Sequence, residues 1–335
     1  LKNLKAPVSK GPVFGQDAAV TIIKRTKDGN FWLGTSNGGL KIYNKDLKKF
    51  NYFKNDPSDK SSLSDDFVQT FFEDNQNNIW LGTISRGLMK VVPSQSLFKP
   101  DGNKLDLLNT LNDKHIRAVY ESKNGTLWVG TIDGLLLQYD LQRNEIQEFR
   151  SDFVAGSKNR LSGPDIDAIY EDKEGIIWIG TFSGIDKLDP KSGTIARQQI
   201  KYDNKIDDFN VDVEAIIEAD NENLWIAVWT YGLFKYNKKT LVIEYYGWQE
   251  SDSTSLSNNQ IFTLFKTKVG DLWVGTSDGL NLFDESHKTF KHYLMGTSVS
   301  SIQEDEKGII WAGTNNGLYK LDLKINTINH YTKEN

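Results

Sequence analysis

Residues Ala168 to Pro190 have the sequence AIYEDKEGIIWIGTFSGIDKLDP, and their pattern is the basis of the predicted fold. The stretch holds an alternating segment, a turn with glycine, a segment built around tryptophan that ends in Gly-Thr, a second tight turn and another alternating segment. Alternation bounded by turn residues predicts short antiparallel β-strands joined by hairpins. A very similar sequence, SIQEDEKGIIWAGTNNGLYKLD, recurs near the end of the chain at Ser301 to Asp322.

The motif Trp-x-Gly-Thr, soon followed by Gly-Leu, recurs with small changes at intervals of 38 to 50 residues. Its seven tryptophans are Trp32, Trp80, Trp128, Trp178, Trp225, Trp273 and Trp311. A period of this length with four short alternating segments per copy is typical of β-propellers, and the 3.6-residue pattern of helical repeats is missing. We therefore predict an all-β fold, a seven-bladed β-propeller of four-stranded antiparallel blades, over residues 17–335. Residues 1–16 are expected to form a lead-in segment or an edge strand.

The repeated residues have structural tasks in such a fold. A tryptophan in the second strand of each blade can fill the wedge between adjacent blades and bury on the order of 150–250 Å². The recurring glycines allow close packing and positive φ at the turns. The residues that the copies share are therefore expected to maintain the fold, and candidate site residues are those that break the pattern.

Composition narrows the classes of partner. The net charge is −5 and no Lys/Arg stripe occurs, so nucleic acid is not expected to bind. No apolar run is long enough to cross a bilayer, and the first residues lack the apolar core of a signal peptide. The 335 residues include no cysteine, which excludes disulfides and thiolate chemistry and weakly favours an oxidising compartment.

The repeat resembles the two-component regulator propeller repeat, on the two stretches quoted above, and the resemblance extends over residues 17–335. Such repeats build the periplasmic sensor regions of hybrid histidine kinases. The resemblance implies a periplasmic, non-catalytic propeller without a cofactor that senses oligosaccharides released from a polysaccharide. It further implies that the partners are another propeller, an immunoglobulin-like domain and kinase domains of the parent receptor, together with a second receptor copy.

One turn breaks the repeat most strongly. Ala227 and Val228 replace Gly-Thr in the fifth copy, and Trp229 and Tyr231 follow on a turn that elsewhere carries small polar residues. Exposed aromatic rings there would suit stacking against a sugar, whereas the alternative is packing beneath a neighbouring loop. Arg86, at the equivalent turn of the second copy, offers a forked donor for a carboxylate or sulfate, or is an ordinary surface arginine.

A second variable set lies near the start of each innermost strand. The column reads Thr21, Gln69, Arg117, Asp167, Glu214, Phe262 and Ser300. Seven strand starts ring the channel mouth of a propeller, so Gln69, Arg117, Asp167 and Glu214 are candidate ligand contacts. An ion-pair network lining water is the alternative. Trp248, at the base of a long polar connection, is a further candidate for ligand contact or for packing.

The same residues also indicate which enzymatic functions are compatible with the chain. Four scattered histidines lack metal-site spacing, so no transition-metal site is predicted. The acidic segment Asp203 to Asp212 has enough oxygen to hold calcium but does not follow the EF-hand order, and an ordinary acidic loop is predicted there. Asp167 and Glu214 could form the carboxylate pair of a glycosidase. A ligand-binding sensor is the leading hypothesis. A protein-interaction scaffold and a carbohydrate-active glycosidase or lyase are the alternatives.

Overall fold

The computed structural model describes residues 19–44, 49–59, 61–91, 106–151, 160–202 and 205–331. The predicted lead-in at residues 1–16 lies outside this range. No helix among the described residues has the length and apolar character needed to cross a membrane.

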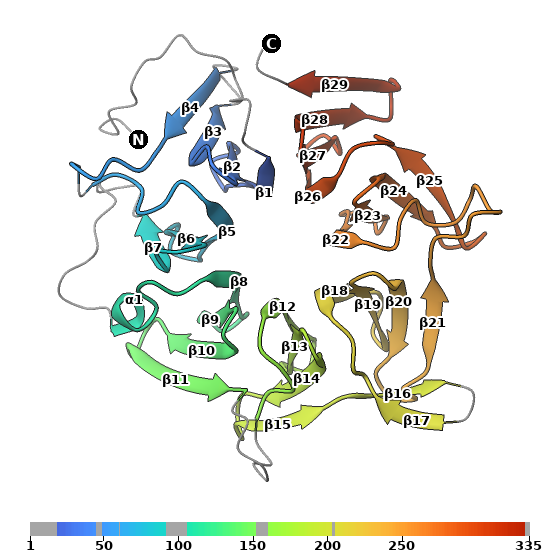
Figure 1. The fold of residues 1–335 in the computed structure, drawn as a ribbon, viewed down its shortest axis with the longest axis horizontal. Coiled ribbons are helices and arrows are strands. Elements are labelled where there is room, and N and C mark those ends of the chain that lie inside the picture. The colour runs from blue at the N-terminus through green and yellow to red at the C-terminus, as the bar shows by residue number, and fades with distance from the viewer. Residues whose placement is uncertain are drawn as a thin grey trace. The chain divides into compact units, whose positions relative to one another are not determined.

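The chain is an all-β, seven-bladed β-propeller of four-stranded antiparallel blades, as predicted (Figure 1). Each blade runs in chain order from its innermost to its outermost strand, because hairpin turns join neighbouring strands. Two compact units are distinguished, residues 1–127, 139–146 and 300–335 in the first and residues 128–138 and 147–299 in the second.

The first unit holds blades 1 and 2 and nearly all of blade 7. Blade 1 consists of β1 (Val20–Arg25), β2 (Phe31–Thr35), β3 (Leu40–Asn44) and β4 (Lys49–Phe53). Blade 2 has three strands among the described residues, β5 (Val68–Glu73), β6 (Ile79–Thr83) and β7 (Leu88–Val91), and the short helix α1 (Asp106–Thr110) follows. Blade 7 consists of β26 (Val299–Glu304), β27 (Ile310–Thr314), β28 (Gly317–Asp322) and β29 (Thr327–Tyr331).

The second unit holds blades 4 to 6. Blade 4 consists of β12 (Ile166–Glu171), β13 (Ile177–Thr181), β14 (Gly184–Asp189) and β15 (Thr194–Arg197). Blade 5 consists of β18 (Val213–Glu218), β19 (Asn223–Val228), β20 (Gly232–Asn237) and β21 (Ile243–Tyr246). Blade 6 consists of β22 (Ile261–Lys266), β23 (Leu272–Thr276), β24 (Gly279–Asp284) and β25 (Thr289–Tyr293). Blade 3, whose residues are divided between the units, has β8 (Ile116–Glu121), β9 (Thr126–Thr131), β10 (Leu135–Asp140) and β11 (Glu145–Arg150).

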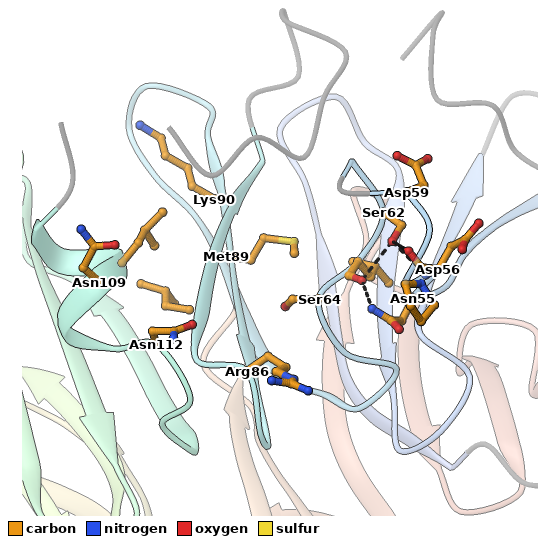
Figure 2. Close-up of a pocket in the computed structure, with 14 residues that line it drawn as sticks. Asn55, Asp56, Asp59, Ser62, Ser64, Arg86, Met89, Lys90, Asn109 and Asn112 are labelled. Carbon is orange, nitrogen blue, oxygen red and sulfur yellow. Dashed lines mark hydrogen bonds between the residues drawn. The ribbon is translucent and has the colours of Figure 1, made fainter. Parts of the chain in front are cut away.

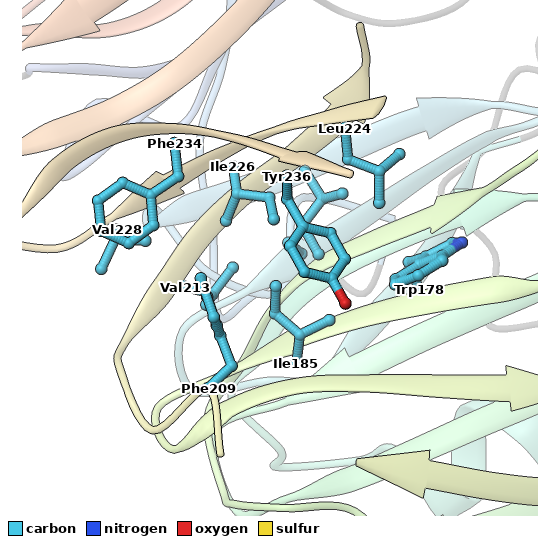
Figure 3. Close-up of a cluster of buried hydrophobic side chains, with 11 residues drawn as sticks. Trp178, Ile185, Phe209, Val213, Leu224, Ile226, Val228, Phe234 and Tyr236 are labelled. Carbon is cyan, nitrogen blue, oxygen red and sulfur yellow. The ribbon is translucent and has the colours of Figure 1, made fainter. Parts of the chain in front are cut away.

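The repeated tryptophans lie in the second strands and are buried, as predicted. Trp178 packs against Tyr236 of the next blade, with ring centroids 6.2 Å apart, inside an apolar cluster that also includes Phe209 (Figure 3). Trp225 meets Phe283 of blade 6 edge-on at 5.2 Å. Each ring therefore fills the wedge between two blades, where burial of its large apolar area stabilises their contact.

Blade 7 draws all four of its strands from its own segment of chain. Its Trp311 stacks near Phe31 of β2, with centroids 4.7 Å apart, and lies 5.9 Å from Tyr43 of β3. Ser300 on β26 donates its hydroxyl to the carbonyl of Val20. Among the described residues, side chains and not a shared strand ladder therefore join the last blade to the first.

A recurring turn connects the first two strands of the blades. Asp172 accepts two backbone N–H groups of its turn, from Glu174 at 3.1 Å and Ile176 at 3.0 Å. Its other oxygen accepts the indole N–H of Trp178 at 2.7 Å. Asp74 with Trp80 and Asp305 with Trp311 repeat this arrangement. One carboxylate thus closes the turn and satisfies the buried indole.

The acidic segment Asp203 to Asp212, for which an ordinary loop was predicted, instead carries part of a hairpin. β16 (Gln199–Tyr202) pairs with β17 (Lys205–Asp208). The backbone N–H of Lys201 donates to the carbonyl of Leu241, and the Tyr236 hydroxyl donates to the carbonyl of Gln199. These bonds to blade 5 supply partners that the local sequence pattern does not reveal, and the prediction of a loop was wrong for this reason.

Candidate functional site

The two variable sets of residues meet at one end of each blade. The backbone N–H that follows the second strand donates to the carbonyl of the residue just before the first strand, as in Ser36 to Ala19, Trp229 to Asp212 and Ser277 to Gln260. We call this end, formed by the turn after Trp-x-Gly-Thr and the residues leading into the innermost strand, the turn end of the blade. The two sets meet here because the first two strands of a blade are antiparallel neighbours.

The column of polar residues coincides with β-bulges. The register between the first two strands shifts around Thr21, Gln69, Asp167, Glu214 and Phe262, each of which is the extra residue of its strand. A bulge redirects the side chain of the extra residue and is common beside functional sites. All five side chains are half-buried.

Two members of the column serve the fold. The Thr21 hydroxyl donates to the carbonyl of Val68 on the next blade, and the Ser300 hydroxyl donates to the carbonyls of Val20 and Gly313. Arg117 occupies the column position on β8 and is half-buried. The charged and amide members, not the small hydroxyl members, remain candidates for ligand contact.

The structure brings Asp167 and Glu214 together, as their neighbouring blades suggested, and adds Asp212. Carboxylate oxygens of these three half-buried residues lie within 4.8 Å of one another. The spacing would let one cation touch all three, but acidic groups often lie this close without an ion, and we assign no metal. Three carboxylates in one place provide several strong acceptors for hydroxyl or amine donors.

The aromatic turn of blade 5 is joined to these acids through the backbone. Trp229 donates its N–H to the Asp212 carbonyl at 2.9 Å. Its half-buried ring packs against Phe262, the column residue of blade 6, with centroids 5.4 Å apart. Tyr231 is 57% exposed and leaves its ring accessible. The turn therefore combines a supported ring and a free ring beside an acidic group.

Trp248 is also accessible, with 50% of its surface exposed. Its backbone N–H donates to Asn259 Oδ1 at 2.7 Å, which fixes the start of the long connection between blades 5 and 6. The connection is anchored by Leu256, which is fully buried. The backbone is thus held while the Trp248 ring faces solvent.

Arg86 lines a cavity of about 370 Å³ beside β7 (Figure 2). Its guanidinium lies 3.3 Å from Asp113 Oδ1, and both side chains are more than half exposed. The other walls carry amide, hydroxyl and apolar groups, such as Asn109, Ser64 and Met89, together with the charged Asp56, Asp59 and Lys90. An exposed ion pair of this kind contributes little to stability, so the guanidinium is available to a ligand at small cost.

The comparisons with known proteins agree with this architecture. The family described as "Two component regulator propeller" matches residues 62–85, 110–133, 160–183, 255–278 and 293–316. The chain carries two-component regulator propeller repeats. No curated protein matches the chain in sequence.

Solved structures share the fold over nearly the whole chain. Two structures of the extracellular domain of BT4673 from B. thetaiotaomicron, named as a putative one component and a putative hybrid two component system, share 21% and 20% identity at a TM-score of 0.55. They match 94% of this chain, which spans 43% of theirs. Virginiamycin B lyase from Staphylococcus aureus matches 92% of the chain and 96% of its own, at 13% identity and a TM-score of 0.63. The WD40 propeller of Doa1 matches 91% of the chain and 93% of its own, at 10% identity and a TM-score of 0.66. At these identities the likeness shows the fold alone.

Comparison of equivalent positions in the blades explains one wall of the cavity in Figure 2. In blade 4 the N–H of Ser162 donates to Asp186 Oδ2 at 2.6 Å, and in blade 6 the N–H of Ser257 donates to Asn281 Oδ1 at 3.0 Å. Met89 occupies the equivalent position of β7 in blade 2. Ser64, the serine of that blade, has a buried hydroxyl with no partner among the residues described. The exchange of a polar residue for methionine removes the acceptor that the serine N–H has in blades 4 and 6. The Ser64 hydroxyl, whose equivalents pair with Thr181 and Thr276, is a second unsatisfied group on the cavity wall.

Proposed function

We propose that this chain is a ligand-binding propeller in the extracytoplasmic sensor region of a hybrid two-component histidine kinase, and that it binds an oligosaccharide derived from a polysaccharide. The observation that carries the proposal is the junction of Trp229 with the carboxylates of Asp167, Asp212 and Glu214. The regulator repeats and the likeness to the extracellular domain of a two-component system support the sensor role and a periplasmic location.

The chemistry of this junction fits a sugar. Aromatic rings offer the apolar, rigid surface on which the C–H face of a pyranose packs, and Tyr231 and Trp248 present such rings with half or more of their surface exposed. Carboxylates accept the hydroxyl hydrogens around the edge of the ring. Because the three acids would repel sulfate or uronate groups, a neutral sugar is the expected ligand at this turn end.

Within the first unit, Gln69, Arg117 and Arg86 are proposed as further ligand contacts in their own right. Gln69 offers both donors and an acceptor from its bulge, and the two arginines offer forked donors. Signal transfer would then depend on the partners of the parent receptor, namely its other propeller, its immunoglobulin-like and kinase domains and a second receptor copy.

Calorimetric titration of the chain with neutral, acidic and sulfated oligosaccharides tests the proposal. We expect a neutral sugar to bind, and Trp229→Ala and Asp167→Asn each to weaken it at least about tenfold. Ile328→Ala is the matched control, because Ile328 is an apolar residue with 50% exposure on the outermost strand of blade 7. Binding of no sugar, or equal affinity in the two site variants and the control, would contradict the proposal.

The same experiment separates the enzymatic alternative. Carboxylate oxygens of Asp167 and Glu214 lie within 4.8 Å of one another, which is compatible with the roughly 5–5.5 Å between the carboxyl groups of a retaining glycosidase, so the fate of the sugar decides between the two functions. Mass spectrometry of the bound sugar after incubation is expected to return the intact mass. A shortened sugar that persists in Trp229→Ala and disappears in Glu214→Gln would instead identify a glycosidase.

A further inference from the structure

Blade 5 is the one blade with no polar side chain at the position of the carboxylate that closes the turn in blades 2, 4 and 7, since blades 1, 3 and 6 have Thr26, Ser122 and Thr267 there. In blades 2, 4 and 7 an aspartate six residues before the tryptophan accepts its indole N–H, at 2.9, 2.7 and 3.3 Å. In blade 5 the tryptophan is Trp225 and the residue six positions before it is Ala219. The indole N–H of Trp225 has no acceptor among the residues that the structure describes.

The neighbouring Asp220 does not replace the missing group. Its Oδ1 accepts the backbone N–H groups of Glu222 at 2.9 Å and Asn223 at 3.0 Å, so the turn itself is closed one residue later than in blade 4. Trp225 is only 4% exposed. Its indole nitrogen is not among the fully enclosed side-chain atoms without a partner, so an acceptor placed beside it can reach the N–H group.

A cavity of about 550 Å³ lies at this position, lined by Ala219 and Trp225 on one side and by the turn after β22 on the other. Lys266, also on its wall, donates its ammonium to the Ala219 carbonyl. A positive charge therefore lies beside the residue that is an aspartate in blades 2, 4 and 7. Leu272, Leu282 and Phe283 add an apolar wall.

In blade 4 an indole N–H and a lysine ammonium both lie next to a carboxylate. There the Asp172 carboxylate receives the indole N–H of Trp178 at 2.7 Å and lies 3.8 Å from the ammonium of Lys238. Blade 5 keeps the two kinds of donor, in Trp225 and Lys266, and lacks the carboxylate. We propose that this cavity binds the carboxylate of a small organic acid, whose apolar part contacts Phe283 and its neighbours.

The other charges of the wall permit an anion. Glu285 pairs with Lys235 at 2.7 Å, and Asp220 lies 3.8 Å from the same ammonium. The Asp284 carboxylate accepts bonds from Ser286 and His287 within its own turn. Asp271 is the remaining acidic residue of the wall, and Lys291 adds a second lysine to Lys266. The carboxylates that could repel a ligand are thus largely compensated.

Nuclear magnetic resonance of the indole N–H groups tests this site directly, because the chain has nine tryptophans. We expect butyrate at millimolar concentration to move one indole resonance, assigned to Trp225 by its loss in Trp225→Phe, and to raise the melting temperature by about 2 °C or more at saturation. Glucuronate is the second probe. A response to both acids points to carboxylate recognition alone, and a response to glucuronate only identifies a sugar acid as the source.

Ala219→Asp is the decisive variant, since it restores the residue of blades 2, 4 and 7. It is expected to fold, to melt at a higher temperature and to lose the response to butyrate. Lys266→Met should weaken butyrate at least about fivefold, and Asp172→Ala, which creates the same vacancy in blade 4, should gain a response. An unchanged Trp225 resonance at 100 mM butyrate (about tenfold above a 10 mM Kd), or an equal response in Ala219→Asp, would overturn the proposal. Trp229→Ala should leave the response intact, which separates this site from the proposed sugar site.

Discussion

Asp186→Asn is expected to stabilise the propeller near neutral pH. Asp186 lies on β14 with no exposed surface, and its Oδ1 has no partner among the described residues. Burial raises the pKa of its carboxyl from 3.8 to about 6, against the opposing effects of the bond from Ser162 and the charge of Arg197. The folded state therefore carries a destabilising charge above pH 6.

The magnitude follows from the pKa shift. A pKa shift of about two corresponds to roughly 3 kcal/mol. Because the structure relaxes around the buried group, we expect Asp186→Asn to raise the free energy of unfolding at pH 7 by about 2 kcal/mol. Asn281 shows the relaxed alternative in blade 6, where the amide accepts the Ser257 N–H and donates to the Val274 carbonyl at 3.1 Å. Ile179 is the residue paired with Asp186, so its carbonyl can receive the same bond in the variant.

The pH dependence distinguishes this explanation from a simple packing effect. Below pH 4 the carboxyl is protonated in both the folded and the unfolded chain, so wild type and variant should differ little. As the pH rises from 4 to 6 the unfolded chain loses its proton before the folded chain, and the stability of the wild type falls relative to the variant. Above pH 6 the difference should be constant.

Urea unfolding of both proteins at pH 4, 5, 6 and 7 measures this difference from the transition midpoints. Asn281→Asp is the matched control, because it places a carboxyl at the equivalent position of blade 6 and should destabilise by a similar amount at pH 7. A gain for Asp186→Asn that is the same at every pH, or no gain at pH 7, would refute the reasoning.

Two further predictions concern the repeat itself. Gly184 has φ of 131°, and an added Cβ would lie 1.9 Å from the carbonyl oxygen of Phe209. Gly184→Ala should therefore lower the free energy of unfolding by more than about 3 kcal/mol, whereas Gly175→Ala, whose nearest neighbour is at 3.8 Å, should cost about 1 kcal/mol, as measured by urea unfolding. Asp74→Ala removes both turn bonds and the acceptor of the Trp80 indole. It should cost about 2–4 kcal/mol and shift the Trp80 indole resonance, and an unchanged melting temperature would contradict this assignment.

The blades could be predicted because their pattern is local and repeated. Alternating strands, turn glycines and Trp-x-Gly-Thr act within about 20 residues, and seven copies compensate for an irregular one such as blade 5. The bond between Asp172 and Trp178 was not predicted although both residues are visible in the sequence. Their distance depends on how the turn folds, which spacing alone does not reveal.

The candidate site was predicted in part for the same reason. The polar column was found by alignment of the copies, but a bulge adds one residue to a strand without a compositional signal, so the direction of Asp167 and Glu214 could not be derived. Asp212 was missed as their neighbour because it lies before β18 and approaches them only through the path of that strand. The sequence likewise shows Met89 where blades 4 and 6 have Asp186 and Asn281, but only the structure shows that Ser64 lies beside it.

The joint between blades 7 and 1 has a consequence for how the protein opens. No two blades share a strand ladder, but the other neighbouring blades are consecutive in the chain, whereas among the described residues blades 7 and 1 are joined by contacts such as the aromatic rings around Trp311 and the hydroxyl bond of Ser300. Local opening requires only the exposure of apolar rings, which costs less than melting a sheet. Local opening of the propeller should therefore begin between blades 7 and 1. Amide protons of β1 and β26 should exchange with solvent before those of β13 or β19.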